Sequence, residues 1–546
     1  MSNRNSDARF ANVPYHDIKR SKFNIPFTHK TTFNAGEIVP FFIELDVLPG
    51  DTFTAHTSAV IRMSTPIWPT MDNCFADIYY FYTANRLSWN HWKDFMGENR
   101  NGAWTQLTEY TVPKLTTPTG GAATGTIMDY MGIPINVAGI TFNALPIRHY
   151  VLIYNEWFRD QNFIAPYSEN KDDTTRTASN IDPTLGGRPF KAAKFHDYFT
   201  SCLPEPQKGS AVTMPLGTMA PVMTNGALSG SALQTTGAAA GSRYDVTLGG
   251  TTTTGPTTVI SPRFNGTNIA GNSTFLFDLS QNSSLYADLT GATAATFNAL
   301  RLAGQTQRIL ERDARCGTRY TEIIKAHFNV HSPDARQQRP EYLGGQRLPI
   351  NINQVLQTSA TSQQSPQGNA GAYSLTGDSQ HSFTKSFTEH GTIIGLVVVR
   401  TDQTYQQGLE RGWSRSRRLD YFWPTLAHIG EQPRYNREIY AQGTNVDDEV
   451  FGYQEAWAEY RYKPARTSGQ FRSTSATPLD SWHYAIRFNS LPVLSQAFLE
   501  QGHAEIDRTL AVTSQISNQF IADFLVDMTV VRPMPVYSVP GMLDHF

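Results

Sequence analysis

The strongest constraint on the fold comes from stretches where β-branched and aromatic residues crowd together between turn signals. EIVPFFIELDVLPGDTFTAHTSAVIRMS, at residues 37–64, holds two such runs on either side of Leu48–Asp51, whose Pro-Gly pair suits a tight turn. CFADIYYFY at residues 74–82 continues the pattern, and IIGLVVV at residues 393–399 has the composition of a buried strand. These stretches predict a β-rich fold with a hairpin at Leu48–Asp51.

Composition agrees with that expectation. The chain has 546 residues, enough for two or three average domains or for one large domain with insertions. Charged residues make up 17%, below the roughly 25% that is usual for soluble domains, while aromatic residues reach 12%. A surface so poor in charge indicates that partners cover much of it. The net charge of −2 excludes a global basic field, so contact with nucleic acid must be local.

Helical patterns interrupt the strands at three places. SWNHWKDFMGE at residues 88–98 begins with Ser88 as a candidate N-cap, and IRHYVLIYNEWFRDQN at residues 147–162 has apolar residues at helical intervals. AATFNALRLAGQTQRILERDAR at residues 294–315 places Leu300 and Leu310 on one face. We expect a helix in each.

The two ends of the chain differ from its middle. Residues 1–30 are polar, contain Pro14 and Pro26, and carry more bases than acids. We interpret them as a basic, internal N-terminal arm that neutralises phosphate; its candidate DNA contacts are Arg4, Arg9, Lys19, Arg20 and Lys22. Residues 531–546 contain three prolines and no helical period, and are expected to form an extended C-terminal arm.

A sharp change of composition marks an insertion. Between Gly209 and Leu300 the charged residues are Arg243, Asp245, Arg263, Asp278 and Asp288. Gly, Ala, Thr and Ser fill the stretch, which suits an inserted surface module of short Thr-rich strands, with a flexible linker as the alternative. We expect this module at 209–295, between two parts of a β core at 31–208 and 296–530.

Patterns that would indicate catalysis or metal binding are weak. The sequence has no GxSxG, no GxxxxGK[ST] and no CxxC. His327 and His331, in HFNVH, have no third ligand spaced nearby and are expected in a strand or loop. Glu455 and Glu459 are better explained as ion-pair partners of nearby bases than as a catalytic pair. We predict no enzyme, no catalytic residue, no metal and no cofactor.

Arginine and aromatic residues gather in GLERGWSRSRRLDYFWP at residues 408–424. Arginine on phosphate with aromatic rings on bases is the physics of single-strand binding, which makes Arg415, Arg417 and Arg418 candidate DNA contacts. The same composition is typical of protein interfaces, where Trp413 and Trp423 would serve. The residues alone leave both interpretations open. For the Glu455–Lys463 part of FGYQEAWAEYRYKPARTSGQFRS, both a helix and a strand fit.

Four long stretches carry a family resemblance. RDARCGTRYTEIIKAHFNVHSPDARQQRPEYLGG resembles the signature region of gokushovirus major capsid proteins, from the small single-stranded DNA phages of the Microviridae. GLERGWSRSRRLDYFWPTLAHIGEQ, FGYQEAWAEYRYKPARTSGQFRSTSATPLDSWHYA and the N-terminal FANVPYHDIKRSKFN are similar to three further parts of that family. The resemblance spans nearly the whole chain; Cys316 and the inserted module depart from it.

The resemblance implies a fold and a role. The fold would be an eight-stranded antiparallel jelly roll with long loop insertions and a few short helices. About 60 copies would form a T=1 icosahedral shell around a circular single-stranded DNA genome. The inserted module would project as a threefold spike that attaches to the host, through the candidate residues Arg243, Tyr244, Arg263 and Phe264. Within such a shell, the subunit-interface candidates are Trp413, Trp423, Trp457, Tyr460, Arg461 and Tyr462.

The resemblance also implies partners and a location. An internal scaffolding protein, a pilot protein, a small DNA-binding protein and a host receptor would accompany the shell. We expect a virion protein assembled in the bacterial cytoplasm, since the polar N-terminus lacks a signal-peptide core and three widely spaced cysteines form no disulfide framework. Two other classes remain as alternatives: a carbohydrate-binding or carbohydrate-cleaving β-protein, and a freestanding single-strand-binding module.

Overall fold

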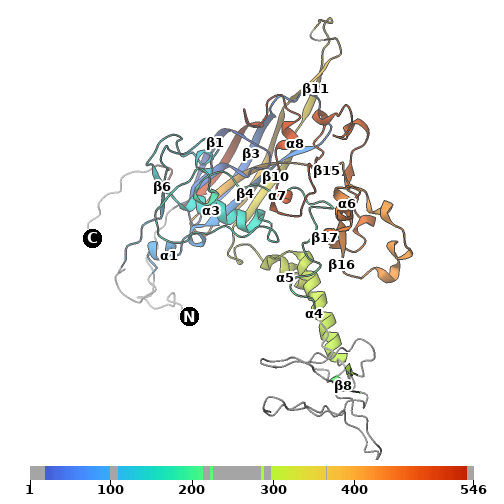
Figure 1. Ribbon diagram of the computed structural model, residues 1–546. Coiled ribbons are helices and arrows are strands. Elements are labelled where there is room, and N and C mark those ends of the chain that lie inside the picture. Colours follow the sequence, from blue (N-terminus) through green and yellow to red (C-terminus); the bar gives the residue numbers. More distant parts are fainter. Residues whose placement is uncertain are drawn as a thin grey trace, which may run out of the picture. The chain divides into compact units, whose positions relative to one another are not determined.

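The computed structural model describes residues 19–98, 108–212, 222–224, 285–287, 297–363 and 366–537 (Figure 1). They are mainly β, with antiparallel sheets and few helices, so the expected fold class is confirmed at that level. The chain divides into two compact units, Met1–Lys208 with Glu311–Phe546, and Gly209–Leu310. The module expected at 209–295 falls within the second unit, where β8 (Val222–Thr224) pairs antiparallel with β9 (Leu285–Ala287).

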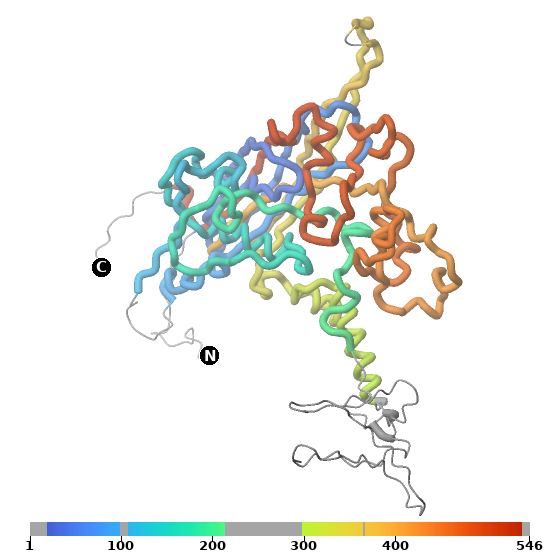
Figure 2. The backbone as a smooth tube through the Cα atoms, viewed as in Figure 1, coloured from blue at the N-terminus to red at the C-terminus, as the bar shows by residue number. Residues whose placement is uncertain are grey.

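Two four-stranded antiparallel sheets form the centre of the first unit. One has the order β1-β19-β3-β13, from β1 (Ser21–Phe33), β19 (Phe520–Arg532), β3 (Thr52–Met63) and β13 (Thr376–Ser386). The other has the order β10-β4-β14-β2, from β10 (Glu341–Pro349), β4 (Cys74–Ala84), β14 (Gly391–Thr401) and β2 (Val39–Val47). The blue β1 and the red β19 lie side by side (Figure 2), so the first and last strands of the sandwich are hydrogen-bonded neighbours in one sheet.

The core lies between the two sheets. Along β19 the buried residues alternate with more exposed ones from Phe520 to Val530, because a strand points successive side chains to opposite faces. Aromatic rings from opposite sheets meet there: the Phe41 and Phe524 centroids are 4.4 Å apart. Polar groups in this core are also paired: Thr57 Oγ1 lies 2.7 Å from the Tyr80 hydroxyl.

Strand β14 is buried on both faces. Nine of its residues in a row, from Gly391 to Val399, are buried, which confirms the prediction of a buried strand from IIGLVVV. One face meets the sandwich core, and the other meets a second apolar cluster that includes Tyr150 and Val151 of α3 (Leu145–Ile153). A strand covered on both sides needs no polar face, so its sequence is continuously apolar.

The predicted hairpin at Leu48–Asp51 does not form. Strands flank this turn as expected, but β2 pairs with β14 while β3 pairs with β19 and β13. The turn therefore joins the two sheets. Gly50 has φ 94°, which favours glycine, and Asp51 accepts a hydrogen bond from the Leu48 N–H at 3.0 Å and pairs with Arg532 Nε at 3.1 Å. These buried contacts fix a corner instead of a hairpin.

Further strands and helices complete the described part of the chain. The remaining strands are β5 (Lys114–Thr116), β6 (Thr141–Asn143), β7 (Arg176–Thr177), β11 (Ile352–Leu356), β12 (Ala370–Ser374), β15 (Thr404–Tyr405), β16 (Glu431–Tyr435), β17 (Val450–Glu455) and β18 (Ala465–Arg466). The other helices are α1 (Trp92–Phe95), α2 (Ile127–Tyr130), α4 (Phe297–Cys316), α5 (Tyr320–Phe328), α6 (Asn436–Ile439), α7 (Gln496–Leu499) and α8 (Ala504–Asp507). A third apolar cluster packs Phe199 against Tyr405 and Phe451 of the segment at residues 405–500.

Helix predictions fare differently at the three places. Helices α3 and α4 are confirmed, and α3 continues into one π-helical turn at Tyr154–Phe158. At residues 88–98 only the four residues of α1 are α-helical, and His91 rather than Ser88 is its N-cap. The Ser88 hydroxyl lies 2.8 Å from the buried His149 Nε2. Ser88 therefore hydrogen-bonds a core side chain instead of capping a helix.

The predicted terminal arms overlap the sandwich. Residues 21–30 of the expected N-terminal arm belong to β1, and Val531 and Arg532 of the expected C-terminal arm belong to β19. Both segments are strands because each supplies the other's ladder of hydrogen bonds, from Ser21 opposite Arg532 to Phe33 opposite Phe520. Residues 1–18 and 538–546 lie outside the described residues.

Candidate assembly and nucleic-acid interface

The arginine- and aromatic-rich segment is a surface loop built from single 3₁₀ turns. These turns are Arg411–Ser414, Arg418–Asp420 and Pro424–Leu426. Ser416 and Arg417 donate their backbone N–H groups to Asp420 Oδ2 at 2.9 and 2.7 Å, which closes the middle turn. Trp413 is 75% exposed and Leu419 68% exposed, so the loop presents large apolar side chains to its surroundings.

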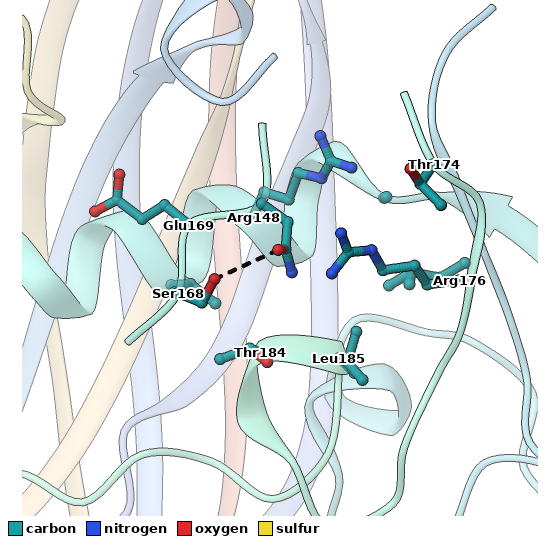
Figure 3. A pocket seen from close by; sticks show the side chains of 11 residues that line it. Arg148, Ser168, Glu169, Thr174, Arg176, Thr184 and Leu185 are labelled. Carbon is teal, nitrogen blue, oxygen red and sulfur yellow. Dashed lines mark hydrogen bonds between the residues drawn. The ribbon is translucent and has the colours of Figure 1, made fainter. Parts of the chain in front are cut away.

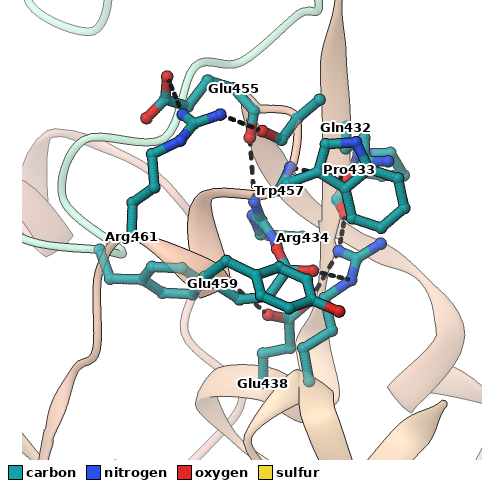
Figure 4. A network of polar contacts seen from close by, with 12 residues as sticks. Gln432, Pro433, Arg434, Glu438, Glu455, Trp457, Glu459 and Arg461 are labelled. Atoms are coloured by element: carbon teal, nitrogen blue, oxygen red, sulfur yellow. Dashed lines mark hydrogen bonds and ion pairs between the residues drawn. The ribbon is translucent and has the colours of Figure 1, made fainter. Parts of the chain in front are cut away.

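The inner side of this loop is tied to one buried carboxylate. Glu459 accepts a hydrogen bond from Arg434 Nη1 at 2.9 Å and from Arg415 Nη2 at 3.1 Å, and Arg411 Nε lies 3.7 Å away (Figure 4). Arg434 is fully buried and the Glu459 side chain is 7% exposed. Burial alone raises the pKa of Glu459, but the Arg434 hydrogen bond and the charges of Arg434 and Arg411 lower it below its usual value.

A second carboxylate extends this network. Glu438 of α6 accepts from the Tyr198 hydroxyl at 2.8 Å, from the Tyr435 N–H at 3.2 Å and from Arg411 Nη1 at 3.3 Å. Burial alone lowers the pKa of Arg434, but Tyr198 and the carboxylates of Glu438 and Glu459 raise it above its usual value, so the guanidinium stays charged. The Arg415 side chain is 14% exposed and paired with Glu459, which gives it a structural role and argues against its prediction as a DNA contact.

Trp457 is the most unusual backbone position of the region. It follows β17 with φ 64° and ψ 25°, a left-handed conformation that a bulky residue rarely adopts. Its N–H donates to Gln432 Oε1 at 3.2 Å (Figure 4). Its indole Nε1 donates to the Leu426 carbonyl at 2.8 Å. Trp457 is only 4% exposed within the subunit, which argues against its prediction as a subunit-interface residue. It locks the loop to β16 from within.

Neither interpretation of Glu455–Lys463 as one regular element is correct. Strand β17 ends at Glu455, Trp457 reverses the chain, and Ala458–Tyr460 forms a single 3₁₀ turn. The prediction that both glutamates are ion-paired is confirmed: Glu459 pairs with the arginines above, and Glu455 Oε2 lies 2.5 Å from Arg461 Nη1. A catalytic pair would need free carboxylates in a cleft.

Several predicted interface residues do lie on the surface. Tyr460 is 51% exposed and Tyr462 54% exposed, and the Arg461 side chain is 47% exposed. Trp423 is 38% exposed, with the Arg418 guanidinium 4.6 Å from its ring centroid. We call Tyr421, Phe422, Trp423 and Tyr460 the aromatic patch; the Phe422 and Tyr460 rings are 6.0 Å apart and Arg415 lies 4.4 Å from the Tyr460 centroid.

The predicted DNA contacts fall into separate places. Arg417 and Arg418 are exposed on the loop that carries the aromatic patch. Lys19, Arg20 and Lys22 are exposed at the beginning of β1, elsewhere in the first unit (Figure 1). Arg4, Arg9 and the host-attachment candidates Arg243, Tyr244, Arg263 and Phe264 lie outside the described residues.

The described part of the chain contains two cavities of very different size. The smaller cavity has a volume of about 10 Å³, enough for about one water molecule, and is lined in part by Arg148, Arg176 and Thr184 (Figure 3). A wider hollow of about 570 Å³ beside β1 contains Lys30 and Asp523, which pair at 3.6 Å. Burial raises the pKa of the Cys74 thiol, and that of Cys202 to about 12, so both are inert. No helix among the described residues is long and apolar enough to cross a membrane.

His327 has partners that its sequence neighbourhood hides. Contrary to the expectation of a strand or loop, it lies in α5, whereas His331 lies beyond the end of that helix. Its Nε2 is 2.7 Å from Asp313 Oδ1 of α4, and Cys316 of α4 is close by. The spacing of Asp313, Cys316 and His327 across two helices was the signal that sequence reasoning missed.

Comparisons with known proteins give a consistent result. A model of the family described as Capsid protein (F protein) matches residues 11–542. Capsid protein VP1 of Bdellovibrio phage phiMH2K is 43% identical over 557 residues, covering all of both chains. Capsid protein VP1 of Chlamydia phage 1 and of Spiroplasma virus 4 are each 41% identical, over 98% and 96% of this chain and 97% and 96% of their own.

Proposed function

The chain belongs to the capsid protein (F protein) family, and from that premise we propose that its copies assemble into a closed icosahedral shell around single-stranded DNA. The family is structural, so this chain is a major capsid protein of the virion and not an enzyme. The resemblance to gokushovirus capsid proteins is thereby confirmed, and the carbohydrate-cleaving alternative is set aside. The observation that carries the proposal is the match of full-length capsid relatives along the whole chain.

The strand order supports a jelly roll. In chain order the eight strands of the sandwich are β1, β2, β3, β4, β10, β13, β14 and β19. The first, last, third and sixth of them form one sheet, and the fifth, fourth, seventh and second form the other. Successive strands thus alternate between sheets for most of the chain, as the wrapped hairpins of a jelly roll require. The long segments between β4 and β10, and between β14 and β19, are then the loop insertions.

Subunit contacts in this proposal come from the exposed apolar side chains. Trp413, Leu419, Tyr460 and Tyr462 are each more than half exposed. Aromatic side chains and arginine are the residue types that contribute most to protein interfaces. Trp413, Trp423, Tyr460, Arg461 and Tyr462 therefore remain our interface candidates, while Arg417 and Arg418 serve either a neighbouring subunit or DNA.

The proposal also assigns roles at the ends and in the insertion. Arg4, Arg9, Lys19, Arg20 and Lys22 would neutralise genome phosphate, and the charge-poor insertion at 209–295 would form a threefold spike for host attachment. A scaffolding protein, a pilot protein, a small DNA-binding protein and a host receptor would be the partners, with assembly in the bacterial cytoplasm. Reversing the five basic residues to acids should reduce DNA packaging more than formation of empty shells. Deleting 215–290 should spare the shell and abolish infection.

Sedimentation and electron cryomicroscopy of expressed protein test the proposal. Sixty copies of a 60.9 kDa chain predict a particle of about 3.7 MDa before any DNA. The chain should be expressed alone and together with the other virion genes, because a scaffold can be required for assembly. A map with icosahedral symmetry and one subunit per asymmetric unit is the expected result. If only small oligomers form under both conditions, the closed-shell proposal is wrong.

A further inference from the structure

Three side chains with metal-binding atoms converge at the corner between α4 and α5. Asp313 and Cys316 are one turn apart at the end of α4, and His327 lies near the end of α5. Their carboxylate oxygen, thiol sulfur and imidazole nitrogen all lie within 4.8 Å of one another, and each residue is partly buried. Neither the subunit interface nor the DNA contacts proposed above use these residues.

The corner that presents them is rigid. Gly317 reverses the chain with φ 93°, a left-handed conformation that strongly favours glycine. The next helix begins at once, because the Arg319 N–H donates to Glu322 Oε2 at 3.1 Å as part of its cap. The relative position of the two helix ends is therefore set by the backbone.

The end of α4 from Glu311 onward and the beginning of α5 are also anchored within the first unit. Arg319 Nη2 donates to the carbonyls of Asn155 and Arg159 at 3.2 and 2.8 Å. Arg315, next to Cys316, pairs with Glu431 of β16, whose side chain is 1% exposed. The three donor atoms thus converge before any ligand arrives, which lowers the cost of binding.

We propose that Asp313, Cys316 and His327 bind one zinc ion, with water as the fourth ligand. Thiolate and imidazole together favour zinc over the hard cations magnesium and calcium. Zinc–ligand bonds of about 2.0–2.3 Å in a tetrahedron place donor atoms about 3.3–3.8 Å apart. The present cluster reaches that geometry by small side-chain rotations that separate His327 from Asp313. On binding, the thiol proton passes to solvent and the thiolate takes its place on the metal.

An ordinary hydrogen bond explains only part of this arrangement. The 2.7 Å contact between His327 Nε2 and Asp313 Oδ1 accounts for two of the three residues. The Cys316 thiol makes only weak contacts to the carbonyls of Gly317 at 3.4 Å and Asp313 at 3.7 Å. Partial burial and then the Asp313 charge raise the pKa of this thiol, whereas Lys208 lowers it; a bound divalent cation would overcome the two unfavourable effects. Zinc would fix α4 to α5.

Cobalt substitution tests the site, independently of shell assembly. Full-length protein, reduced and freed of metal with a chelator, is titrated with Co²⁺ and then with Zn²⁺. We expect one Co²⁺ per chain, a thiolate-to-cobalt charge-transfer band, and loss of that band as Zn²⁺ displaces cobalt. Cys316→Ser should abolish the band, and His327→Gln should weaken Co²⁺ binding at least about 100-fold, more than loss of a supporting outer group. Asp313→Asn should weaken it less.

Matched controls separate this site from adventitious metal. His331→Gln removes an exposed histidine four residues from His327, and Cys202→Ala removes a buried thiol elsewhere; both should bind Co²⁺ as the parent chain does. Zinc should also raise the thermal unfolding temperature of the parent and not of Cys316→Ser, which guards against loss of binding through misfolding. Absence of a charge-transfer band in the parent with Co²⁺ in excess, or an unchanged band in Cys316→Ser, overturns the inference.

Discussion

Replacement of Glu459 by Gln tests whether one buried carboxylate holds the arginine-rich loop. The Glu459 side chain is 7% exposed and faces Arg434, which is fully buried, and Arg415, which is 14% exposed. Glutamine keeps the size of the side chain and one acceptor oxygen but removes the negative charge. Breaking a buried ion pair from one side costs about 3–5 kcal/mol, because the remaining charge is left uncompensated. That is a large part of the roughly 5–15 kcal/mol that stabilises a typical domain.

The measurement is urea unfolding of the unassembled subunit, followed by tryptophan fluorescence. Glu455→Gln is the matched control, because Glu455 and its partner Arg461 have side chains 31% and 47% exposed. An exposed pair of this kind contributes about 0–1 kcal/mol. Adding Arg434→Met to Glu459→Gln should recover part of the loss, since it removes the buried charge that Glu459→Gln leaves unpaired.

The pH dependence supplies an independent check. The folded-state pKa of Glu459 is lower than its ordinary 4.5, with the Arg434 hydrogen bond and nearby arginine charges outweighing burial. A carboxylate with a depressed pKa contributes stability above its unfolded-state pKa and loses it as the pH falls through the folded-state value. The difference between the parent and Glu459→Gln should therefore be complete at neutral pH and shrink below about pH 4.5. Equal free energies for Glu459→Gln and Glu455→Gln at neutral pH would refute the reasoning.

Four further perturbations probe other parts of the structure. Trp457→Ala should lose about 3–5 kcal/mol of unfolding free energy, and Trp457→Gly about 1 kcal/mol less than that, because glycine adopts φ 64° freely; equal losses would show that the backbone is unstrained. Gly36→Ala should greatly reduce folded protein, since its Cβ would lie 2.2 Å from the Gln501 carbonyl oxygen, whereas Gly120→Ala meets nothing within 4 Å and should cost about 1 kcal/mol by thermal unfolding. Burial and then Arg148 lower the pKa of His149 to about 3, so between pH 6.5 and about 3 this histidine binds a proton in the unfolded chain but not in the folded chain. As the pH is lowered through this range, the parent should lose about 1.4 kcal/mol of unfolding free energy per pH unit more than His149→Asn does. Parallel pH profiles would contradict this. Trp413→Ala should leave subunit unfolding unchanged and reduce particle yield in sedimentation, because the ring is 75% exposed; an unchanged yield would remove Trp413 from the interface.

The strands could be predicted because period-two alternation is local, but their partners could not. Residues 39–63 read correctly as two strands around Leu48–Asp51. Their pairing depends on β14 and β19, which lie more than 300 residues further along the chain. A short turn favours pairing between its two flanking strands only when no distant strand pairs with them more favourably. Here the distant strands bury more apolar surface, so β2 and β3 pair with them instead. The helix at α4 was predictable for the opposite reason, because its apolar period is contained within its own 20 residues.

Arginine and aromatic residues resisted prediction because two different environments use them. Arg415 and Trp457 lie inside the network around Glu459, whereas Arg418 and Trp413 of the same stretches are exposed. Composition cannot separate the two sets, since arginine occurs in buried ion pairs and in interfaces, and tryptophan in cores and in interfaces. The buried and exposed residues differ in their distance from Glu459. The chain reverses at Trp457, which no sequence pattern predicts, and this reversal brings the Glu459 carboxylate under the loop.

This division gives the loop of residues 411–423 two sides with different tasks. Arg411 and Arg415 on the inner side are held by Glu459 and Glu438, so the backbone of the loop is fixed before any subunit arrives. Trp413 and Leu419 on the outer side are exposed, and in the proposed shell they would meet a neighbouring subunit without the entropy cost of ordering a flexible segment. A substitution on the outer side should therefore change assembly alone, while one at Glu459 should change folding and assembly together. In the proposed shell, the buried network would let this irregular loop act as a preformed surface.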